Sequence, residues 1–171
     1  MKIKLFAIAA LGAIATACAS TPPVEEASIP QPEPEPQVTE TTEPMGPVEG
    51  SREHFVETAG DRVFFDLDRH DLSNEARTVL RRQAAWLASY PGARIMIAGN
   101  CDERGTREYN LALGARRANA AREYLVSQGV DPSRINTTSY GKENPTCTQS
   151  NETCWAVNRN ATTTIVDGYT N

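Results

Sequence analysis

A change of composition near residue 51 limits how much of this chain can fold. Between Ala19 and Ser51 there are seven Glu and no Lys or Arg, and prolines stand at positions 32, 34 and 36. Such a segment cannot bury a core, so we expect it to be disordered and extended. At ~3.1 Å per residue its reach approaches ~100 Å, which suits a tether. About 115 residues remain, enough for one domain.

The N-terminus has the features of a secretory signal. Two lysines precede an apolar run from Leu5, and the small residues Ala15–Ala17 directly precede Cys18. The run is shorter than the ~20 residues that span a bilayer. The triplet before Cys18 resembles a bacterial lipobox, so we expect cleavage there and acylation of Cys18. Ordinary signal cleavage that leaves Cys18 free is the alternative.

These features predict three segments and a location. They are a lipoprotein signal peptide (residues 1–17), acylated Cys18 with a disordered Pro/Glu-rich linker (18–51), and a folded domain (52–171). Cys18 is not followed by the aspartate that retains lipoproteins in the inner membrane. We therefore expect anchoring in outer-membrane lipid, with the domain facing the periplasm.

The net charge of −5 arises outside the domain. From Arg52 onward, 15 acidic and 15 basic residues balance, whereas the linker carries the acidic excess. A neutral domain lacks the basic surface that phosphate backbones attract, so we predict no nucleic-acid partner.

Hydrophobic spacing predicts the elements of the domain. We expect strands at 62–68, 94–99, 135–140 and 161–166, long helices at about 73–89 and 106–128, and a short helix at about 151–158. The second long helix has one stripe of small and apolar side chains for burial. The order β-α-β-α-β-(α)-β implies an α+β sandwich, with two long helices packed on one face of a mixed four-stranded sheet.

The stretch 99–117 concentrates charge where a loop enters the second long helix. Gly105 suits a turn and Thr106 an N-cap. Free backbone N–H groups and the positive dipole end at such a helix start suit an anion. Asn110 and Arg117, seven residues apart, point within about 20° of each other. Both can therefore face the loop.

Asp102 in this loop and Arg117 on the helix are the predicted core of a site. Arg117 suits a carboxylate and Asp102 an ammonium, so together they fit a zwitterionic amino-acid head group. Phe65 and Asp66 can lie beside them if the first two strands are neighbours. The alternative is that Asp102 and Arg117 pair with each other and only fix the loop; spacing alone does not decide.

Motifs for catalysis or metal binding are missing from the sequence. There is no Gly-x-Ser-x-Gly, phosphate loop or nucleophile–base pair. His54 and His70 fall in predicted loops, and no ligand set has metal spacing. We therefore predict no enzyme, metal or cofactor. A cell-wall enzyme that uses Asp102 or Glu103 as general acid or base is the catalytic alternative.

Four segments carry a resemblance to a known family: 102–119 (Asp-Glu-Arg-Gly-Thr-Arg-Glu-Tyr-Asn-Leu-Ala-Leu-Gly-Ala-Arg-Arg-Ala-Asn), Phe64–Asp68, Ser139–Glu143 and Trp155–Arg159. On these the chain resembles the outer-membrane protein A C-terminal-like domain family and its lipoprotein members, over about 62–166. The resemblance implies non-covalent binding of peptidoglycan through the meso-diaminopimelate of the stem peptide. It also implies a tether between outer membrane and cell wall within the Tol system, in support of envelope integrity and cell division.

The resemblance also implies residue roles. Asp102 would take the ammonium of the ligand's side-chain stereocentre and Arg117 its carboxylate. Further ligand-binding positions are Asn110, Leu113, Phe65, Asp66 and Arg104. Glu103 and Arg104 are candidates for contact with the periplasmic β-propeller of the Tol system. Motor-stator anchors share the domain but carry a transmembrane helix, which this sequence lacks.

The cysteines and one loop position depart from the family pattern. Asn100-Cys101 stands where members often have His-Ala or His-Thr, and Asn can replace one hydrogen bond of His. In an oxidising periplasm we expect a Cys147–Cys154 disulfide, worth ~2 kcal/mol, with Cys101 left over and buried. A bridge from Cys101 to either of them stays open, because three thiols do not define their pairing.

Overall fold

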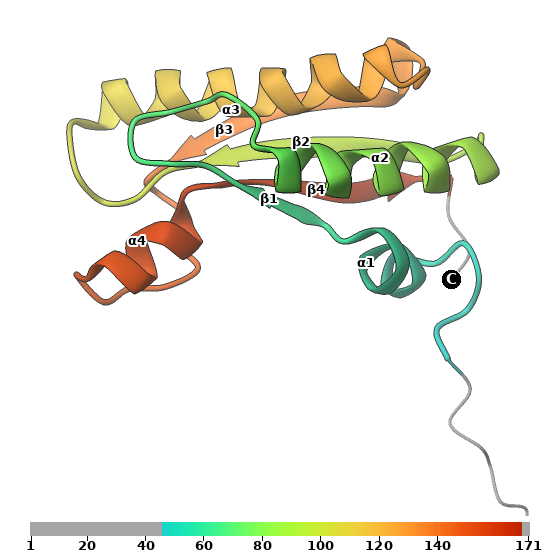
Figure 1. Cartoon of the computed structure of the whole chain (residues 1–171), viewed down its shortest axis with the longest axis horizontal. Coiled ribbons are helices and arrows are strands. Elements are labelled where there is room, and N and C mark those ends of the chain that lie inside the picture. The colour runs from blue at the N-terminus through green and yellow to red at the C-terminus, as the bar shows by residue number, and fades with distance from the viewer. Residues whose placement is uncertain (1–45, 169–171) are drawn as a thin grey trace, which may run out of the picture. The chain divides into compact units, whose positions relative to one another are not determined.

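The computed structural model describes residues 46–168, which are drawn in colour in Figure 1. The predicted signal peptide, Cys18 and nearly all of the predicted linker therefore lie outside the described residues. Within 46–168 no helix is both long and apolar enough to cross a membrane. The elements in chain order are α1 (Arg52–Ala59), β1 (Arg62–Phe64), α2 (Asn74–Ser89), β2 (Arg94–Asn100), α3 (Arg107–Ser127), a 3₁₀ turn (Pro132–Arg134), β3 (Ile135–Gly141), α4 (Glu152–Asn158) and β4 (Asn160–Asp167).

One four-stranded mixed sheet carries the fold, in the order β1-β4-β2-β3. β2 and β3 are parallel, and β4 is antiparallel to both of its neighbours, β1 and β2. The long helices α2 and α3 lie on the same face of this sheet, and α1 packs beside α2 (Figure 1). The predicted α+β sandwich is confirmed.

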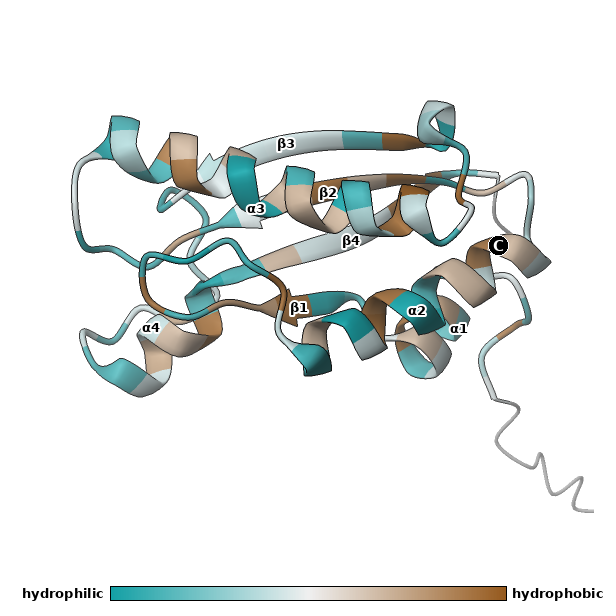
Figure 2. Cartoon of the chain, turned by 45° about the horizontal axis from the view of Figure 1, so that its top comes forward, coloured by the Kyte–Doolittle hydropathy of each residue, from teal (hydrophilic) through white to brown (hydrophobic). Residues whose placement is uncertain are grey.

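Polar side chains start the helices, as sequence signals predict. Ser73 Oγ accepts the N–H of Ala76, and Thr106 Oγ1 accepts the N–H of Tyr109. Figure 2 shows apolar and polar bands along α2 and α3. Buried residues recur about every three to four positions in both helices, as expected for helices buried on one face. The buried core between helices and sheet includes Leu80, Leu87, Ile95, Ile97, Ala118, Ala121, Leu125 and Ile165.

Glycine inside α3 has a packing role. A Cβ on Gly114 would lie 2.7 Å from the carbonyl oxygen of Gly99 and would overlap Ser139 Oγ. A Cβ on Gly99 would overlap the Gly114 carbonyl in turn. α3 therefore rests on β2 backbone to backbone, which fixes the start of the helix close to the end of the strand.

Two expectations about the first elements are wrong, and the condition stated for Phe65 and Asp66 is not met. α1 was not predicted, and His54 lies in this helix rather than in a loop. β1 spans Arg62–Phe64 rather than 62–68, because the chain turns after Phe65 and reaches a positive φ of 59° at Asp68. The first two strands are not neighbours, because β4 lies between β1 and β2.

Candidate functional site

A cavity of about 190 Å³ opens where the 101–106 loop, the start of α3 and the β1–α2 loop meet. It brings together five of the seven predicted ligand-binding residues, and adds Arg159. The residues used below are Asp102, Arg104, Asn110, Leu113, Arg117 and Arg159. The sequence stretch 99–117 thus supplies most of the wall of this cavity.

Arg117 is fully buried and is held by backbone carbonyls. Its Nε donates to Arg69 O at 2.9 Å, its Nη1 to Asn100 O at 2.8 Å, and its Nη2 to Asp66 O at 3.2 Å. Nη1 also donates to Cys101 Sγ at 3.4 Å. The side chain therefore ties the β1–α2 loop to the end of β2, with one N–H of Nη2 left over for another acceptor.

The charge of Arg117 has no counter-ion beside it. None of the ion pairs formed within residues 46–168 includes this guanidinium. Burial lowers the pKa of Arg117 and outweighs the opposing effects of Cys101 and Asp102. The ring of Phe65 lies 5.2 Å away and adds only a weak cation–π contact. A buried cation at a cavity wall favours an anion in that cavity.

Asp102 is buried as well, but it is saturated by arginines. Arg104 Nη2 lies 2.7 Å from its Oδ2, Arg104 Nε lies 3.1 Å from its Oδ1, and Arg159 Nη1 lies 3.4 Å from Oδ2. Burial alone would raise the pKa of Asp102, but the hydrogen bonds from Arg104 and Arg159 outweigh it and hold the pKa below its ordinary value. The alternative in which Asp102 pairs with Arg117 is therefore wrong.

Arg159, between α4 and β4, is a site residue that sequence spacing missed. Its Nε donates to Phe65 O at 3.1 Å, and its Nη2 lies 2.7 Å from Glu152 Oε1. Its Nη1 contacts Asp102, so the Arg159 guanidinium links the segment after β1, the 101–106 loop and α4. The segment 155–159 carried part of the family resemblance, which was the one signal that pointed to it.

Asn110 and Leu113 shape the cavity from α3. Asn110 Nδ2 donates to Arg104 O at 2.7 Å and to Thr106 O at 3.0 Å, so it closes the loop onto the helix. Leu113 is buried and supplies an apolar wall. Asn110 faces the loop, as its spacing from Arg117 predicts. Its Nδ2 hydrogen bonds, however, go to carbonyls of the loop.

Asn100 and Cys101, the two residues before Asp102, differ in whether they line the cavity. The Asn100 side chain donates to Asn160 Oδ1 at 2.8 Å and does not line the cavity. Cys101 is a buried free thiol at the cavity wall, and burial raises its pKa. Cys147 and Cys154 form a disulfide with each other.

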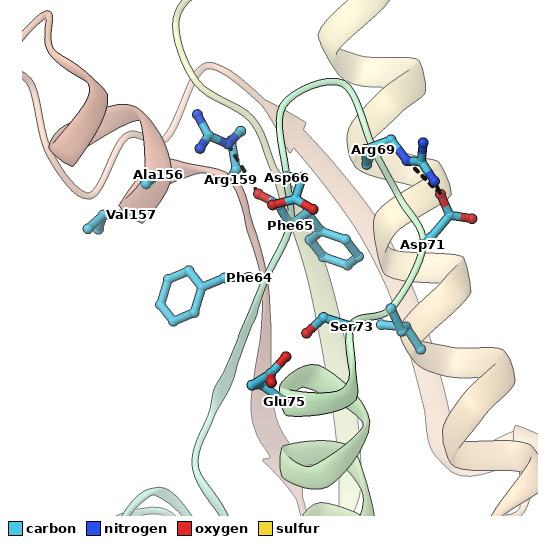
Figure 3. Close-up of a pocket in the computed structure, with 11 residues that line it drawn as sticks. Phe64, Phe65, Asp66, Arg69, Asp71, Ser73, Glu75, Ala156, Val157 and Arg159 are labelled. Carbon is cyan, nitrogen blue, oxygen red and sulfur yellow. Dashed lines mark hydrogen bonds and ion pairs between the residues drawn. The ribbon is translucent and has the colours of Figure 1, made fainter.

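Phe65 and Asp66, two of the predicted ligand-binding residues, line a neighbouring cavity and not this one. The second cavity, of about 690 Å³, lies between α4 and the start of α2 and shares Arg159 with the first. Figure 3 shows the Phe64 and Phe65 rings pointing to opposite sides of the chain. The Asp66 carboxylate lines the larger cavity, and only its backbone carbonyl reaches Arg117. No group of His, Cys, Asp and Glu in the described part of the chain could hold a metal ion.

Comparison with known proteins defines the class. Residues 64–159 match the model of the OmpA family, and the chain belongs to this family. It is similar to proteins named peptidoglycan-associated lipoprotein. The one from Rhizobium meliloti is 53% identical over 116 residues, which are 68% of this chain and 66% of that relative. The one from Mesorhizobium japonicum is also 53% identical over 116 residues, 68% of this chain and 69% of that relative. The chain thus spans about two thirds of these relatives' length.

Solved structures agree on the fold. The crystal structure of the peptidoglycan-associated lipoprotein from Burkholderia pseudomallei is 40% identical, with a TM-score of 0.61, over 62% of this chain and 90% of that one. The C-terminal domain of Helicobacter pylori MotB has a TM-score of 0.58 at 20% identity, over 62% of this chain and 84% of that one. The second likeness concerns the fold alone.

Proposed function

We propose that this protein binds peptidoglycan non-covalently, through the meso-diaminopimelate of the stem peptide. The observation that carries the proposal is Arg117, a fully buried guanidinium at a cavity wall with no ion-pair partner among residues 46–168. An unpaired buried charge costs several kcal/mol, of the order of ~3–5, and a ligand carboxylate would recover part of this cost. The name of the relatives, peptidoglycan-associated lipoprotein, supports peptidoglycan as the binding partner.

In the proposed complex the two ends of a zwitterion meet opposite charges. The ligand carboxylate accepts the spare N–H of Arg117, and the ammonium of the same centre meets Asp102. Leu113 offers an apolar wall to the methylene groups of the ligand. Asn110 keeps the loop closed, so the two charges stay at a fixed separation.

The site is proposed to bind without catalysis. A general acid works best when its pKa lies near the working pH. The pKa of Asp102 is lowered instead, so this carboxylate stays ionised at neutral pH and has no proton to give. Glu103 is bound through its carboxylate by Trp155, at 3.0 Å, on the outside of the loop. Neither acid suits the catalytic alternative.

The place in the envelope is also a proposal. We propose that acylated Cys18 anchors the protein in outer-membrane lipid, and that the domain tethers this membrane to the wall in the periplasm. Arg104 lines the cavity and Glu103 precedes it in the same loop, so a Tol-system β-propeller that contacts both would lie next to the cavity. Wall and partner would then compete for one surface.

A pull-down with purified sacculi tests the ligand. Arg117→Ala and Asp102→Asn should each weaken binding about 10- to 100-fold, since each removes charged hydrogen bonds to the ligand worth about 1.5–3 kcal/mol. Retained binding in both variants would overturn the proposal.

The structure supplies a matched control for Arg117. Arg134 also donates to three backbone carbonyls, those of Leu87, Tyr90 and Ala93. It lines neither of the two cavities described above. Arg134→Ala should therefore lose stability as Arg117→Ala does, while it keeps full binding to sacculi. Thermal unfolding of each variant separates loss of fold from loss of binding.

A further inference from the structure

Arg104 holds the carboxylate that the proposed ligand needs. Its guanidinium lies against both oxygens of Asp102, at 3.1 Å and 2.7 Å, and 4.1 Å from the centre of the Trp155 ring. With Arg159 on the same carboxylate, neither oxygen of Asp102 is open to a further cation. A ligand ammonium cannot reach Asp102 while Arg104 stays in place.

We infer that Arg104 is an internal cation that the ligand's ammonium displaces from Asp102, and that this exchange sets the selectivity of the site. The inference rests on the proposed function. The guanidinium stands where the ammonium would stand and satisfies the same carboxylate. Arg104 is thus a competitor of the ligand rather than a contact of it.

The two arginines on Asp102 differ in how firmly they are held. The Arg159 side chain is 8% exposed and is anchored at Phe65 O, Asp102 and Glu152. The Arg104 side chain is 35% exposed, and its contacts are Asp102 and the face of Trp155. The Arg104 guanidinium therefore gives up less packing and fewer anchoring contacts than Arg159 when it rotates. Arg104 is therefore the one that leaves.

The loop backbone does not have to move when Arg104 leaves. Asn110 holds the carbonyl of Arg104, and Lys142 Nζ donates to the carbonyls of Glu103 and Gly105 at 3.1 Å and 2.7 Å. The backbone is thus fixed from α3 and from the segment after β3. Rotation of one side chain opens Asp102, and the guanidinium can keep its stacking contact with Trp155.

This exchange favours a zwitterion over either of its halves. A carboxylate without an ammonium can satisfy Arg117 but leaves Arg104 on Asp102. An ammonium without a carboxylate must displace Arg104 and gains nothing from Arg117. A zwitterion replaces one cation on Asp102 by another and adds an anion beside Arg117, so only it gains at both positions.

Calorimetric titration of the purified protein tests the exchange with two probes. The probes are meso-diaminopimelate and pimelate, the dicarboxylate of the same chain length without amino groups. In Arg104→Gln, affinity for meso-diaminopimelate should rise about three- to tenfold because the competitor is gone. Affinity for pimelate should stay equal or fall. The control Arg107→Gln removes a nearby exposed arginine, paired with Glu143 at 3.4 Å, and should change neither.

A spectroscopic readout follows the side chain itself. The Nε–H NMR signal of Arg104 should lose its hydrogen-bonded shift on saturation with meso-diaminopimelate and keep it with pimelate. Weaker binding of meso-diaminopimelate by Arg104→Gln, or an unmoved signal, overturns the inference while the proposed function stands. Failure of the wild-type protein to bind sacculi overturns both.

Discussion

Arg117 and Arg134 share one hydrogen-bond pattern but differ in their proposed roles, ligand binding for Arg117 and structure alone for Arg134. Each arginine donates to three backbone carbonyls. Arg134 is partly exposed at the turn before β3, where water screens its charge. Arg117 is fully buried at a cavity wall, where its charge stays strong. Burial and the cavity, not the hydrogen bonds, therefore distinguish the proposed ligand arginine from a structural one.

Asp102 should make stability depend on acid pH. Its folded pKa lies below the ordinary value of 3.8, so its ionised form stabilises the fold. This contribution is complete above the unfolded pKa and is lost as pH falls through the lowered folded pKa. The difference in unfolding free energy between wild type and Asp102→Asn should therefore be full at pH 7 and shrink below about pH 4.

Urea unfolding at neutral and acid pH measures this difference. Asp71→Asn is the control, because Asp71 pairs with Arg69 at 2.9 Å while both side chains are about two-thirds exposed. An exposed pair contributes little, so this variant should resemble wild type at neutral pH. A wild-type advantage over Asp102→Asn that is constant from pH 7 to pH 3 would contradict the argument.

At the scale of secondary-structure elements, local hydrophobic periodicity was sufficient to predict most helices and strands. Spacing and caps predicted α2, α3, α4 and three of the strands, because those signals lie within each segment. α1 was not predicted, because it is short and buries only Phe55 and Ala59. The position of β4 between β1 and β2 could not be predicted from local sequence patterns, because tertiary packing decides the order of strands.

The candidate site was only partly predictable for the same reason. Asp102, Asn110 and Arg117 share a loop and a helix, so their spacing carries information. Arg159 comes from the far end of the chain, and no local spacing relates it to Asp102. The partners of Arg117 are backbone carbonyls, which leave no trace in a pattern of side chains.

Contact between α3 and β2 leads to a stability prediction. Alanine is favoured over glycine inside a helix by about 1 kcal/mol. In Gly114→Ala the new Cβ would nevertheless press against Gly99 O and Ser139 Oγ, both held in place. We expect a net loss of about 1–3 kcal/mol of unfolding free energy, typical of overpacking.

Chemical denaturation measures the effect of Gly114→Ala. Gly92→Ala is the matched control, because its Cβ would meet only Gly168 O at an ordinary 3.8 Å. This control should change stability little. A Gly114→Ala protein as stable as wild type would show that α3 can shift away from β2 without cost.

At the scale of the whole molecule, the folded unit extends beyond the family match. The match begins at residue 64, whereas α1 lies before it. α1 is nevertheless packed on α2: the rings of Phe55 and Trp86 lie 5.0 Å apart, and Trp86 Nε1 donates to His54 Nδ1 at 3.2 Å. Ser51 caps this helix, so the folded unit includes residues from about 51 onward and not only the matched segment.

Two truncations test this boundary. A fragment of residues 46–171 should unfold at the same temperature as the full chain and bind sacculi equally well, because every described contact of α1 is kept. A fragment of residues 60–171 should lose about 3–5 kcal/mol, as expected when a buried Phe is removed. Its cavity residues stay in the chain, so at a temperature where it is folded it should still bind. Equal melting temperatures of the two fragments would show that α1 does not contribute to stability. If fragment 46–171 melted at a lower temperature than the full chain, part of the folded unit would lie before residue 46.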